Sequence, residues 1–387
     1  MPAFAETASN LDMRPGVTET SNEVYHLHRM MFWWCVGIGA VVFGAILYSV
    51  VAHRKRPDRT AADFHENTFV EIIWTVIPFL ILIVMAIPAT KTLISMHDTS
   101  ESELTIKITG YQWKWHYEYL EYQDKSPLKI AFFSNLATPE DQINNPVRTA
   151  GLFPSNSNGF EGDRTLKEKN NNYLLEVDAP VIIPTGKKVR FLLTSNDVIH
   201  SWWVPDFGFK KDAIPGFINE VWTNVPVGKE GTYRGQCAEL CGARHGFMPI
   251  EVKAVTEEEF SQWLADSSEA QTKEAEQAAG DADKVFTMEE LMALGETEYQ
   301  AKCAACHQAN GQGLPPTFPS LVGSKIATGP VADHINIVNH GKGVMPAFKD
   351  QLPAKVRAAI ITYERNAWGN NVGDMVQPKD VTALENK

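Results

Sequence analysis

The residues best suited to chemistry are soft metal ligands gathered in one loop. Cys237 and Cys241 are separated by three residues, and His245 and Met248 follow them closely. His200 lies some distance upstream. One Cys, two His and a weakly bound Met form the ligand set of a blue-copper site. A second thiolate allows two copper ions to be bridged, with one His completing each ion, so the loop predicts a dinuclear copper centre.

The remaining ligands of this centre, and its alternatives, follow from the same residues. Met248 is expected to be the weak ligand of one copper ion, and the backbone carbonyl of Glu239 to serve the other. Two Cys and two His also form a structural zinc site, and Cys237 with Cys241 could form a buried disulfide instead. The Met, and the position of His200 on a distant strand, favour copper.

A second pair of cysteines lies in the C-terminal part of the chain. Cys303, Cys306 and His307 form a C-x-x-C-H motif, the signature of covalent c-type haem attachment. The thiols would bond to the porphyrin vinyl groups, and His307 would be the proximal iron ligand. Met345 is the best candidate for the second axial ligand, with His340 as a rival. A thioredoxin-like dithiol would need a βαβ context, which is absent from the surrounding sequence pattern.

The composition of the chain limits the class of protein. The sequence has 387 residues, of which 44% are hydrophobic, and its mean hydropathy is −0.21, which excludes a polytopic transporter. The net charge of −12 excludes a generally basic nucleic-acid binder and allows an acidic surface that attracts a basic protein partner. Five cysteines are too few for a disulfide scaffold.

Two apolar runs near the N-terminus predict a transmembrane hairpin. Residues 31–52 contain no charged side chain, and a helix of this length crosses a hydrocarbon core of about 30 Å. Residues 72–89 form a second run that contains Pro78 and Pro88, which membrane helices tolerate when neighbours satisfy the freed carbonyls. A pair of buried core helices is the weaker interpretation, because a globular domain seldom holds two such runs so close together.

The segment between the two runs predicts the orientation of the hairpin. Residues 53–59 contain four Lys or Arg side chains, which place this loop in the cytoplasm. Both termini, and everything after about Thr90, are then expected in the periplasm. The small-x-small run at residues 3–5 suggests that an upstream signal peptide is missing. Glu71, at the cytoplasmic edge of the second run, is either a residue of the membrane interface or part of a proton path.

The rest of the chain divides into a β region, a linker and a small helical domain. Short alternating runs predict strands at 104–109, 173–177, 188–194, 220–224, 232–235 and 250–255, which is typical of a sandwich or barrel. Residues 123–172 are predicted to be a long irregular insertion. Residues 261–283, rich in Ala, Glu, Gln and Ser, are predicted to be a tether that could contain a short helix. Residues 295–308 and 353–368 are predicted helices of a domain with one haem.

Several of these motifs together resemble the cytochrome c oxidase subunit II family. The loop from Cys237 to Met248, with His200, is similar to the dinuclear copper A signature of that family. Residues 70–78, 111–119 and 212–216 resemble its second span, its aromatic stretch and a further motif. Nitrous oxide reductases share the copper loop but not the hairpin and the aromatic stretch. The resemblance covers roughly residues 23–263, apart from the insertion.

The resemblance implies a cupredoxin-like β-barrel and roles for three further residues. Glu239 would serve copper through its carbonyl and a magnesium ion, at the interface with subunit I, through its carboxylate. Glu71 matches the acidic residue near the mouth of a proton channel. Trp113 matches the tryptophan through which electrons enter. Without the resemblance, Trp113 would be interpreted as a packing residue.

The resemblance also implies a function. The chain would pass electrons from a soluble donor cytochrome, through haem c and copper A, to subunit I of a terminal oxidase. Subunit I would reduce oxygen to water, coupled to proton translocation. Expected partners are subunit I, other oxidase subunits and membrane lipid, and no nucleic acid. A membrane-anchored copper-binding or electron-carrier protein outside an oxidase is the alternative. A quinol oxidase subunit is excluded, because that relative lacks the copper ligands.

The predicted organisation is therefore multi-domain, with a two-helix transmembrane hairpin, a cupredoxin-like β-barrel and an all-α class I cytochrome c domain. A fused cytochrome c domain resembles bacterial oxidases, which places the chain in a bacterial inner membrane. The predicted boundaries are 1–30 for an exported N-terminal segment, 31–95 for the hairpin, 96–260 for the copper domain, 261–284 for the linker and 285–387 for the cytochrome c domain.

Overall fold

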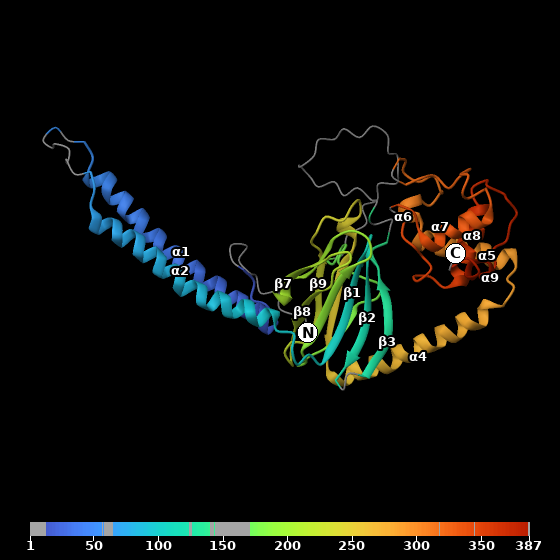
Figure 1. Cartoon of the computed structure of the whole chain (residues 1–387), viewed down its shortest axis with the longest axis horizontal. Coiled ribbons are helices and arrows are strands. Elements are labelled where there is room, and N and C mark those ends of the chain that lie inside the picture. Colours follow the sequence, from blue (N-terminus) through green and yellow to red (C-terminus); the bar gives the residue numbers. More distant parts are fainter. Residues whose placement is uncertain are drawn as a thin grey trace. The chain divides into compact units, whose positions relative to one another are not determined.

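The structure, a computed structural model, describes residues 13–55, 57, 65–123, 126–139, 143, 171–316, 318–343 and 345–385. The small-x-small run at residues 3–5, part of the basic loop and most of the predicted insertion lie outside the described residues. The chain forms two compact units, Met1–Leu264 and Ala265–Lys387. Figure 1 draws the whole chain, and its element labels are used below.

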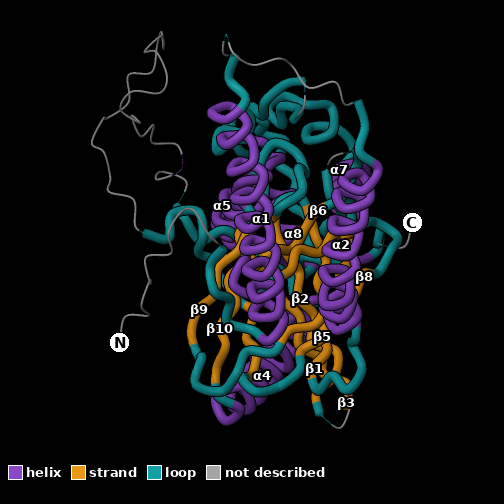
Figure 2. The backbone as a smooth tube through the Cα atoms, turned by 90° about the vertical axis from the view of Figure 1, so that its left-hand side faces the viewer, coloured by secondary structure: helices purple, strands orange, loops and turns teal. Residues whose placement is uncertain are grey.

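The first unit begins with two long helices, α1 (Glu19–Ala52) and α2 (Thr68–His97). Figures 1 and 2 both show them side by side. Each is long and apolar enough to cross a membrane, and their middle residues expose large apolar side chains. Pro78 and Pro88 lie inside α2, so the helix continues through both, as the sequence predicts.

Helix α1 starts twelve residues before the apolar run because of a capping box. The Thr18 hydroxyl accepts a hydrogen bond from the Ser21 backbone N–H, and the Ser21 hydroxyl accepts one from the Thr18 N–H. This reciprocal pair satisfies two N–H groups that a helix start otherwise leaves unpaired.

Two five-stranded sheets follow the hairpin. The strands are β1 (Leu104–Tyr111), β2 (Lys114–Tyr122), β3 (Ser126–Ser134), β4 (Val181–Pro184), β5 (Val189–Ser195), β6 (His200–Val204), β7 (Phe209–Ala213), β8 (Asn219–Thr223), β9 (Gly231–Cys237) and β10 (Pro249–Val255). The orders are β3-β2-β1-β5-β8 and β4-β10-β9-β6-β7. The pairs β1–β5 and β4–β10 are parallel and the other pairs are antiparallel. The predicted strands from residue 104, 188, 220, 232 and 250 are confirmed.

Alternation along the strands explains the core of this β-domain. Trp115, Tyr117 and Tyr119 of β2 are at most 1% exposed, while the residues between them are partly exposed, as expected for a strand with one buried face. They pack in one hydrophobic core with residues of both sheets, such as Phe191 and Trp202. The core therefore lies between the two sheets.

Two sequence predictions for this unit are wrong. Residues 173–177 form no strand, because only one isolated bridge, Leu136 to Val177, pairs this segment. The predicted irregular insertion begins instead with the regular strand β3, Ser126–Ser134, which pairs antiparallel with β2.

The hairpin is joined to the β-domain at the N-terminal end of α1. The Val17 N–H donates to the Asp206 carbonyl over 3.1 Å, and the Thr18 hydroxyl donates to the Phe207 carbonyl over 3.0 Å. Both acceptors lie in the short helix η1 (Pro205–Phe207). Burial raises the pKa of the Asp206 carboxyl group, although the Arg14 charge opposes this shift. We call these contacts, together with Gly208, the η1 clamp.

A single helix connects the two units. Helix α4 (Glu257–Ala282) contains almost all of the predicted linker, and its Ala, Glu, Gln and Lys residues favour helix. Near its start, Phe260 is fully buried and Trp263 packs on Tyr119 with the ring centroids 4.9 Å apart. The tether is therefore helical over a longer stretch than the sequence alone indicated.

The second unit is a small helical domain. Its helices are α5 (Met288–Lys302), α6 (Ala304–His307), α7 (Val331–His340), α8 (Ala354–Asn366) and α9 (Pro378–Thr382). Helices α5 and α8 cross closely at Gly295, where an added Cβ would lie 2.2 Å from the Ala359 carbonyl oxygen. Buried residues of α7, α8 and α9 form a second core, which includes Ile335, Ile361 and Val381.

Candidate metal and haem centres

The structure brings the predicted copper ligands together at one end of the β-domain. The ligand atoms of His200, Cys237 and Cys241 all lie within 4.8 Å of one another. The two sulfur atoms are 3.9 Å apart, and the His200 Nδ1 is 3.9 Å from the Cys237 sulfur. The His245 Nδ1 is 3.5 Å from the Cys241 sulfur. Each sulfur thus has one imidazole nitrogen beside it.

The two weaker predicted ligands face the same sulfur atoms. The Met248 sulfur lies 3.5 Å from the Cys241 sulfur, and Met248 is 1% exposed. The Glu239 carbonyl oxygen lies 3.3 Å from the Cys237 sulfur, while the Glu239 residue is exposed. The carbonyl therefore faces the cluster, and the residue keeps access to its surroundings.

Different elements supply the members of this cluster. His200 begins β6, and Cys237 ends β9, which is its neighbour in the sheet. Cys241 and Met248 lie in the loop from β9 to β10. Gly110 of the opposite sheet makes room for the His200 ring, since an added Cβ there would lie 2.7 Å from His200 Cδ2. His200 is therefore packed between the two sheets.

Each of the two thiols shifts the pKa of the other. The hydrogen bond between them lowers the pKa of Cys237, burial opposes this shift, and His200 adds to it. The same hydrogen bond raises the pKa of Cys241, and burial raises it further. The pair therefore loses a first proton readily and a second only with difficulty. A bound metal cation would remove the second proton, because a coordinating thiol is deprotonated.

Sequence reasoning missed two residues beside the cluster, Asp197 and Gln112. The Asp197 carboxylate is 2.8 Å from the His200 Nε2. Burial lowers the pKa of His200, but the contacts with Asp197 and Cys237 together outweigh burial, so the pKa is raised. The Gln112 side-chain amide donates to the Cys241 carbonyl over 2.8 Å. The sequence offered one indication of this role. Asp197 lies three residues before the predicted ligand His200, which begins β6.

Trp113 lies against the same loop. Its indole N–H donates to the Cys241 carbonyl over 3.1 Å. An added Cβ at Gly242 would lie 3.1 Å from the Trp113 ring, and Gly242 has a φ of +115°, a conformation that glycine adopts without strain. The structure thus places Trp113 in direct contact with the backbone of a predicted copper ligand.

The donor set of this cluster fits a dinuclear copper site. Two thiols within bridging distance, two imidazoles, a thioether and a carbonyl match the soft and borderline ligands that copper prefers. A closed zinc site would use four ligands and leaves the Met248 sulfur and Glu239 carbonyl without a purpose. The described cysteines form no disulfide, so that alternative finds no support in the described residues.

The residues of the C-x-x-C-H motif lie around the short helix α6. Cys303 caps this helix, while Cys306 and His307 belong to it. His307 is 8% exposed, and its Nδ1 bonds to the Pro319 carbonyl over 2.9 Å. Within the described residues the His307 Nε2 has no hydrogen bond, so this nitrogen is available to an iron ion. Such a bond on the second nitrogen is usual for a metal-ligating histidine.

The two candidates for the other axial ligand differ in their surroundings. Met345 is partly buried against the core of the helical domain. His340 uses both ring nitrogens, which bond to the Asn336 and Glu385 carbonyls. The structure therefore favours Met345 over His340, and the donor chemistry of Cys303, Cys306, His307 and Met345 fits a covalent haem.

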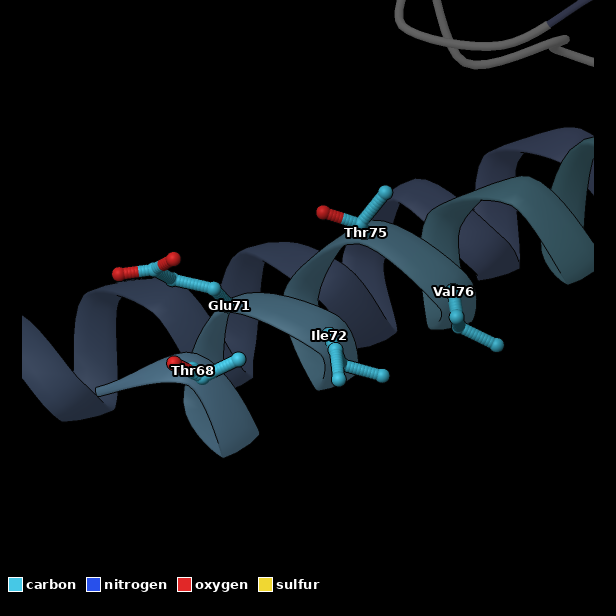
Figure 3. Close-up of a pocket in the computed structure, with 5 residues that line it drawn as sticks. All are labelled: Thr68, Glu71, Ile72, Thr75 and Val76. Carbon is cyan, nitrogen blue, oxygen red and sulfur yellow. The ribbon is translucent and has the colours of Figure 1, made fainter. Parts of the chain in front are cut away.

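Glu71 lies far along the hairpin from the copper ligands, in the first turn of α2. It lines a hollow of about 250 Å³ together with Thr68, Ile72, Thr75 and Val76 (Figure 3). Glu71 is exposed in the isolated chain. The structure thus places this carboxyl group on a helix that can span a membrane, away from the copper ligands predicted in the same unit.

Comparison with known proteins agrees with this geometry. Residues 6–92 match the transmembrane domain of cytochrome c oxidase subunit II, and residues 160–255 match its periplasmic domain. Residues 290–363 match the family described as cytochrome c oxidase, cbb3-type, subunit III. The three matches cover the hairpin, the copper cluster and the C-x-x-C-H motif.

Two individual relatives give the same result. A probable cytochrome c oxidase subunit 2 of Rickettsia bellii is 37% identical over 255 residues, which are 66% of this chain and 83% of the relative. Cytochrome c oxidase subunit 2 of Cereibacter sphaeroides is 32% identical over 251 residues, 65% of this chain and 78% of the relative. The crystal structure of the periplasmic domain of subunit II of cytochrome oxidase from Bradyrhizobium japonicum is 35% identical, covers 44% of this chain and 98% of that chain, and has a TM-score of 0.32.

A membrane hairpin, a β-domain with a two-thiol metal cluster and a C-x-x-C-H helical domain define a membrane-anchored electron-transfer subunit of a respiratory complex. The chain belongs to the cytochrome c oxidase subunit II family and carries an additional C-terminal cytochrome c domain. The predicted fold class and the predicted function as an oxidase subunit are confirmed. An electron carrier outside an oxidase is not favoured.

Proposed function

We propose that this chain receives electrons for a terminal oxidase at a covalent haem and a dinuclear copper A centre, and that the residues assembled above hold these groups. When bound, the haem and the copper ions supply one-electron transfer from a soluble donor cytochrome toward subunit I, where oxygen is reduced to water. The observation that carries the proposal is the pair of sulfur atoms 3.9 Å apart, each beside a different histidine.

The chain's own residues would organise the copper centre as follows. Cys237 and Cys241 would bridge the ions, His200 and His245 would each complete one ion, and Met248 would be a weak ligand. Their burial keeps the ligands in place, since Cys237, Cys241 and Met248 are at most 3% exposed and His200 is fully buried. Rigid ligands favour rapid electron transfer because little rearrangement accompanies a change of charge.

Three further roles belong to this proposal. Glu239, with its carbonyl toward the Cys237 sulfur and an exposed residue surface, would use its carboxylate for a magnesium ion shared with subunit I. Trp113 would accept electrons, supported by its hydrogen bond to the Cys241 carbonyl. Glu71 would stand at the mouth of a proton path, supported by its position on a membrane helix beside a hollow lined by two threonines.

The proposed location is the bacterial inner membrane, with the redox domains and both termini in the periplasm. The basic residues of the segment between α1 and α2 support this orientation. The contacts of the η1 clamp place the β-domain at the opposite end of the hairpin from that segment. The predicted domain boundaries belong to this proposal as well.

The test compares two cysteine substitutions in the full chain. Cys237→Ser is expected to abolish the paramagnetic resonance signal of one electron shared by two copper ions, while the haem content stays at one per chain. Cys35→Ser is the matched control, because Cys35 is exposed on α1. A shared-electron signal that survives Cys237→Ser contradicts the ligand assignment. A single copper or a zinc ion in the unaltered chain contradicts the dinuclear centre.

A further inference from the structure

The carboxylate of Asp197 lies beside His200, on the side of the imidazole ring that faces away from the Cys237 sulfur. We propose that Asp197 is a positioning residue that fixes the protonated nitrogen of His200 and makes the two histidine ligands electronically unequal. The inference rests on the proposed copper centre, in which His200 is a ligand and Asp197 binds no metal.

Asp197 is in direct contact with His200. The Asp197 Oδ1 lies 2.8 Å from the His200 Nε2, and the His200 Nδ1 faces the Cys237 sulfur. An ionised carboxylate accepts hydrogen bonds and donates none. The His200 proton therefore belongs on Nε2, and the Nδ1 lone pair points toward the sulfur atoms.

Backbone hydrogen bonds hold the Asp197 carboxylate in place. The Val198 N–H donates to the Asp197 Oδ1, and the Gln112 N–H donates to the Oδ2, both over 2.7 Å. These donors come from two separate segments, the connection between β5 and β6 and the turn between β1 and β2. A carboxylate with both oxygens held by backbone groups keeps one orientation, and so keeps the imidazole ring in one orientation.

Gln112 connects the Asp197 carboxylate to the loop that carries the second thiol, Cys241. Gln112 donates through its backbone to Asp197, and through its side chain to the Cys241 carbonyl over 2.8 Å. Trp113, the next residue, also donates to that carbonyl. One short turn therefore connects the residue that orients His200 to the loop that carries Cys241.

His200 and His245 differ in burial and in hydrogen bonding. His200 is fully buried and bonded to a carboxylate. His245 is only partly buried, and among the described residues nothing bonds to its Nε2. A carboxylate partner makes a ligating imidazole a stronger electron donor. The site next to His200 therefore favours the more oxidised state, so the shared electron density is unequal between the two positions.

The substitution Asp197→Asn tests this inference because an amide cannot replace the carboxylate. Three donors lie within 2.8 Å of the carboxylate oxygens, namely the Val198 N–H, the Gln112 N–H and the His200 Nε2–H. The Ser195 hydroxyl also donates to Oδ1, over 3.4 Å, while Asn offers one oxygen and one NH₂ group. In either orientation the NH₂ group faces at least one of the three donors. When it faces His200, the ring proton must move to Nδ1.

Three measurements on Asp197→Asn are informative. In the metal-free full chain in detergent, selectively ¹⁵N-labelled histidine should show His200 protonated at Nε2 in the unaltered chain and partly at Nδ1 in the variant. Added copper should bind about 10- to 100-fold more weakly. In the assembled oxidase, the copper centre should have a higher reduction potential. The first readout needs no metal, so its failure is distinguishable from failure of the proposed copper centre.

Asp178→Asn is the matched control. Asp178 also accepts a backbone N–H, that of Asn135, together with the Asn135 side-chain amide, over 2.7 and 2.8 Å, and the substitution removes the same charge. It should leave the His200 spectrum, copper affinity and potential unchanged. Equal shifts in both variants would indicate a general effect of charge and overturn the proposal, as would an unchanged affinity and potential in Asp197→Asn.

A second variant covers the case in which Asp197→Asn does not fold. Asp197→Glu keeps the charge but displaces the oxygen atoms, so it should keep the His200 proton on Nε2 while binding copper more weakly than the unaltered chain. A folded Asp197→Glu chain with His200 protonated on Nδ1, or with unaltered copper affinity, would overturn the positioning role.

Discussion

Gly208 in the η1 clamp offers the sharpest test of how the hairpin is joined to the β-domain. It follows η1 with a φ of +78°, and an added Cβ would lie 2.5 Å from the Ser21 Cα at the start of α1. Gly208→Ala is therefore expected to open the contact between α1 and the β-domain. Gly216→Ala is the matched control, because Gly216 has a φ of +73° and nothing within 4 Å of an added Cβ.

The magnitude follows from two separate costs. A left-handed conformation destabilises a non-glycine residue by about 1–2 kcal/mol, and this cost applies to both alanine variants. The overlap with Ser21 adds about 1–3 kcal/mol, the usual cost of overpacking, and it applies to Gly208 alone. A difference of that size corresponds to about 5- to 150-fold in an opening equilibrium.

Hydrogen–deuterium exchange of the full chain in detergent measures this opening. The amides to follow are those of Val17 and Asn22, which donate to the Asp206 and Thr18 carbonyls over 3.1 and 3.0 Å. Gly208→Ala should accelerate their exchange about 5- to 150-fold relative to Gly216→Ala. Equal exchange in the two variants would refute the argument that close packing at Gly208 holds α1 in place.

Three further predictions concern other parts of the chain. Met345→Ala should leave the haem covalently attached but remove the sulfur-to-iron absorption band at the red end of the spectrum, and an unchanged band would assign the ligand to another residue. Gly295→Ala should lower the melting temperature of the cytochrome c domain, because its Cβ would lie 2.2 Å from a carbonyl oxygen of α8. Gly280→Ala should not lower it, because an added Cβ there has no neighbour within 4 Å. Equal melting temperatures in the two variants would contradict the close crossing of α5 and α8. Asp206→Asn should stabilise the chain at neutral pH, because burial raises the pKa of that carboxyl group and the folded state disfavours its ionised form. This gain should disappear as the pH falls below about 3.9, the unfolded value, where both states bind the proton, and a pH-independent difference in denaturation would contradict the assignment.

Local patterns in the sequence predicted much of the fold. The apolar runs identified both membrane helices, and alternation identified strands such as β1 and β5. The same alternation is visible at Trp115, Tyr117 and Tyr119, but the density of aromatic residues drew the interpretation to a family motif rather than to a strand. The alternation at 173–177 was misleading, because a strand needs β-pairing along its length, and this described segment has an isolated β-bridge at Val177.

Long-range pairing could not be predicted from these patterns. Strand β1 pairs in parallel with β5, with Leu104 opposite Val189, across a separation that no turn motif marks. The residues of the proposed copper centre could be selected from the sequence because only a few residue types bind soft metals. Asp197 was not, because an aspartate near a strand is common, and its role depends on the 2.8 Å contact with His200.

The position of His200 between the two sheets has a consequence for the life of the chain in the cell. Gly110 of one sheet leaves room for the ring of His200, which belongs to the other sheet, so separation of the sheets would disperse the predicted metal donors. A metal that binds only the folded state stabilises it by RT ln(1 + [L]/Kd). Copper bound at the proposed centre would therefore stabilise the folded β-domain, and a chain made without copper would have a β-domain that opens and is degraded more readily.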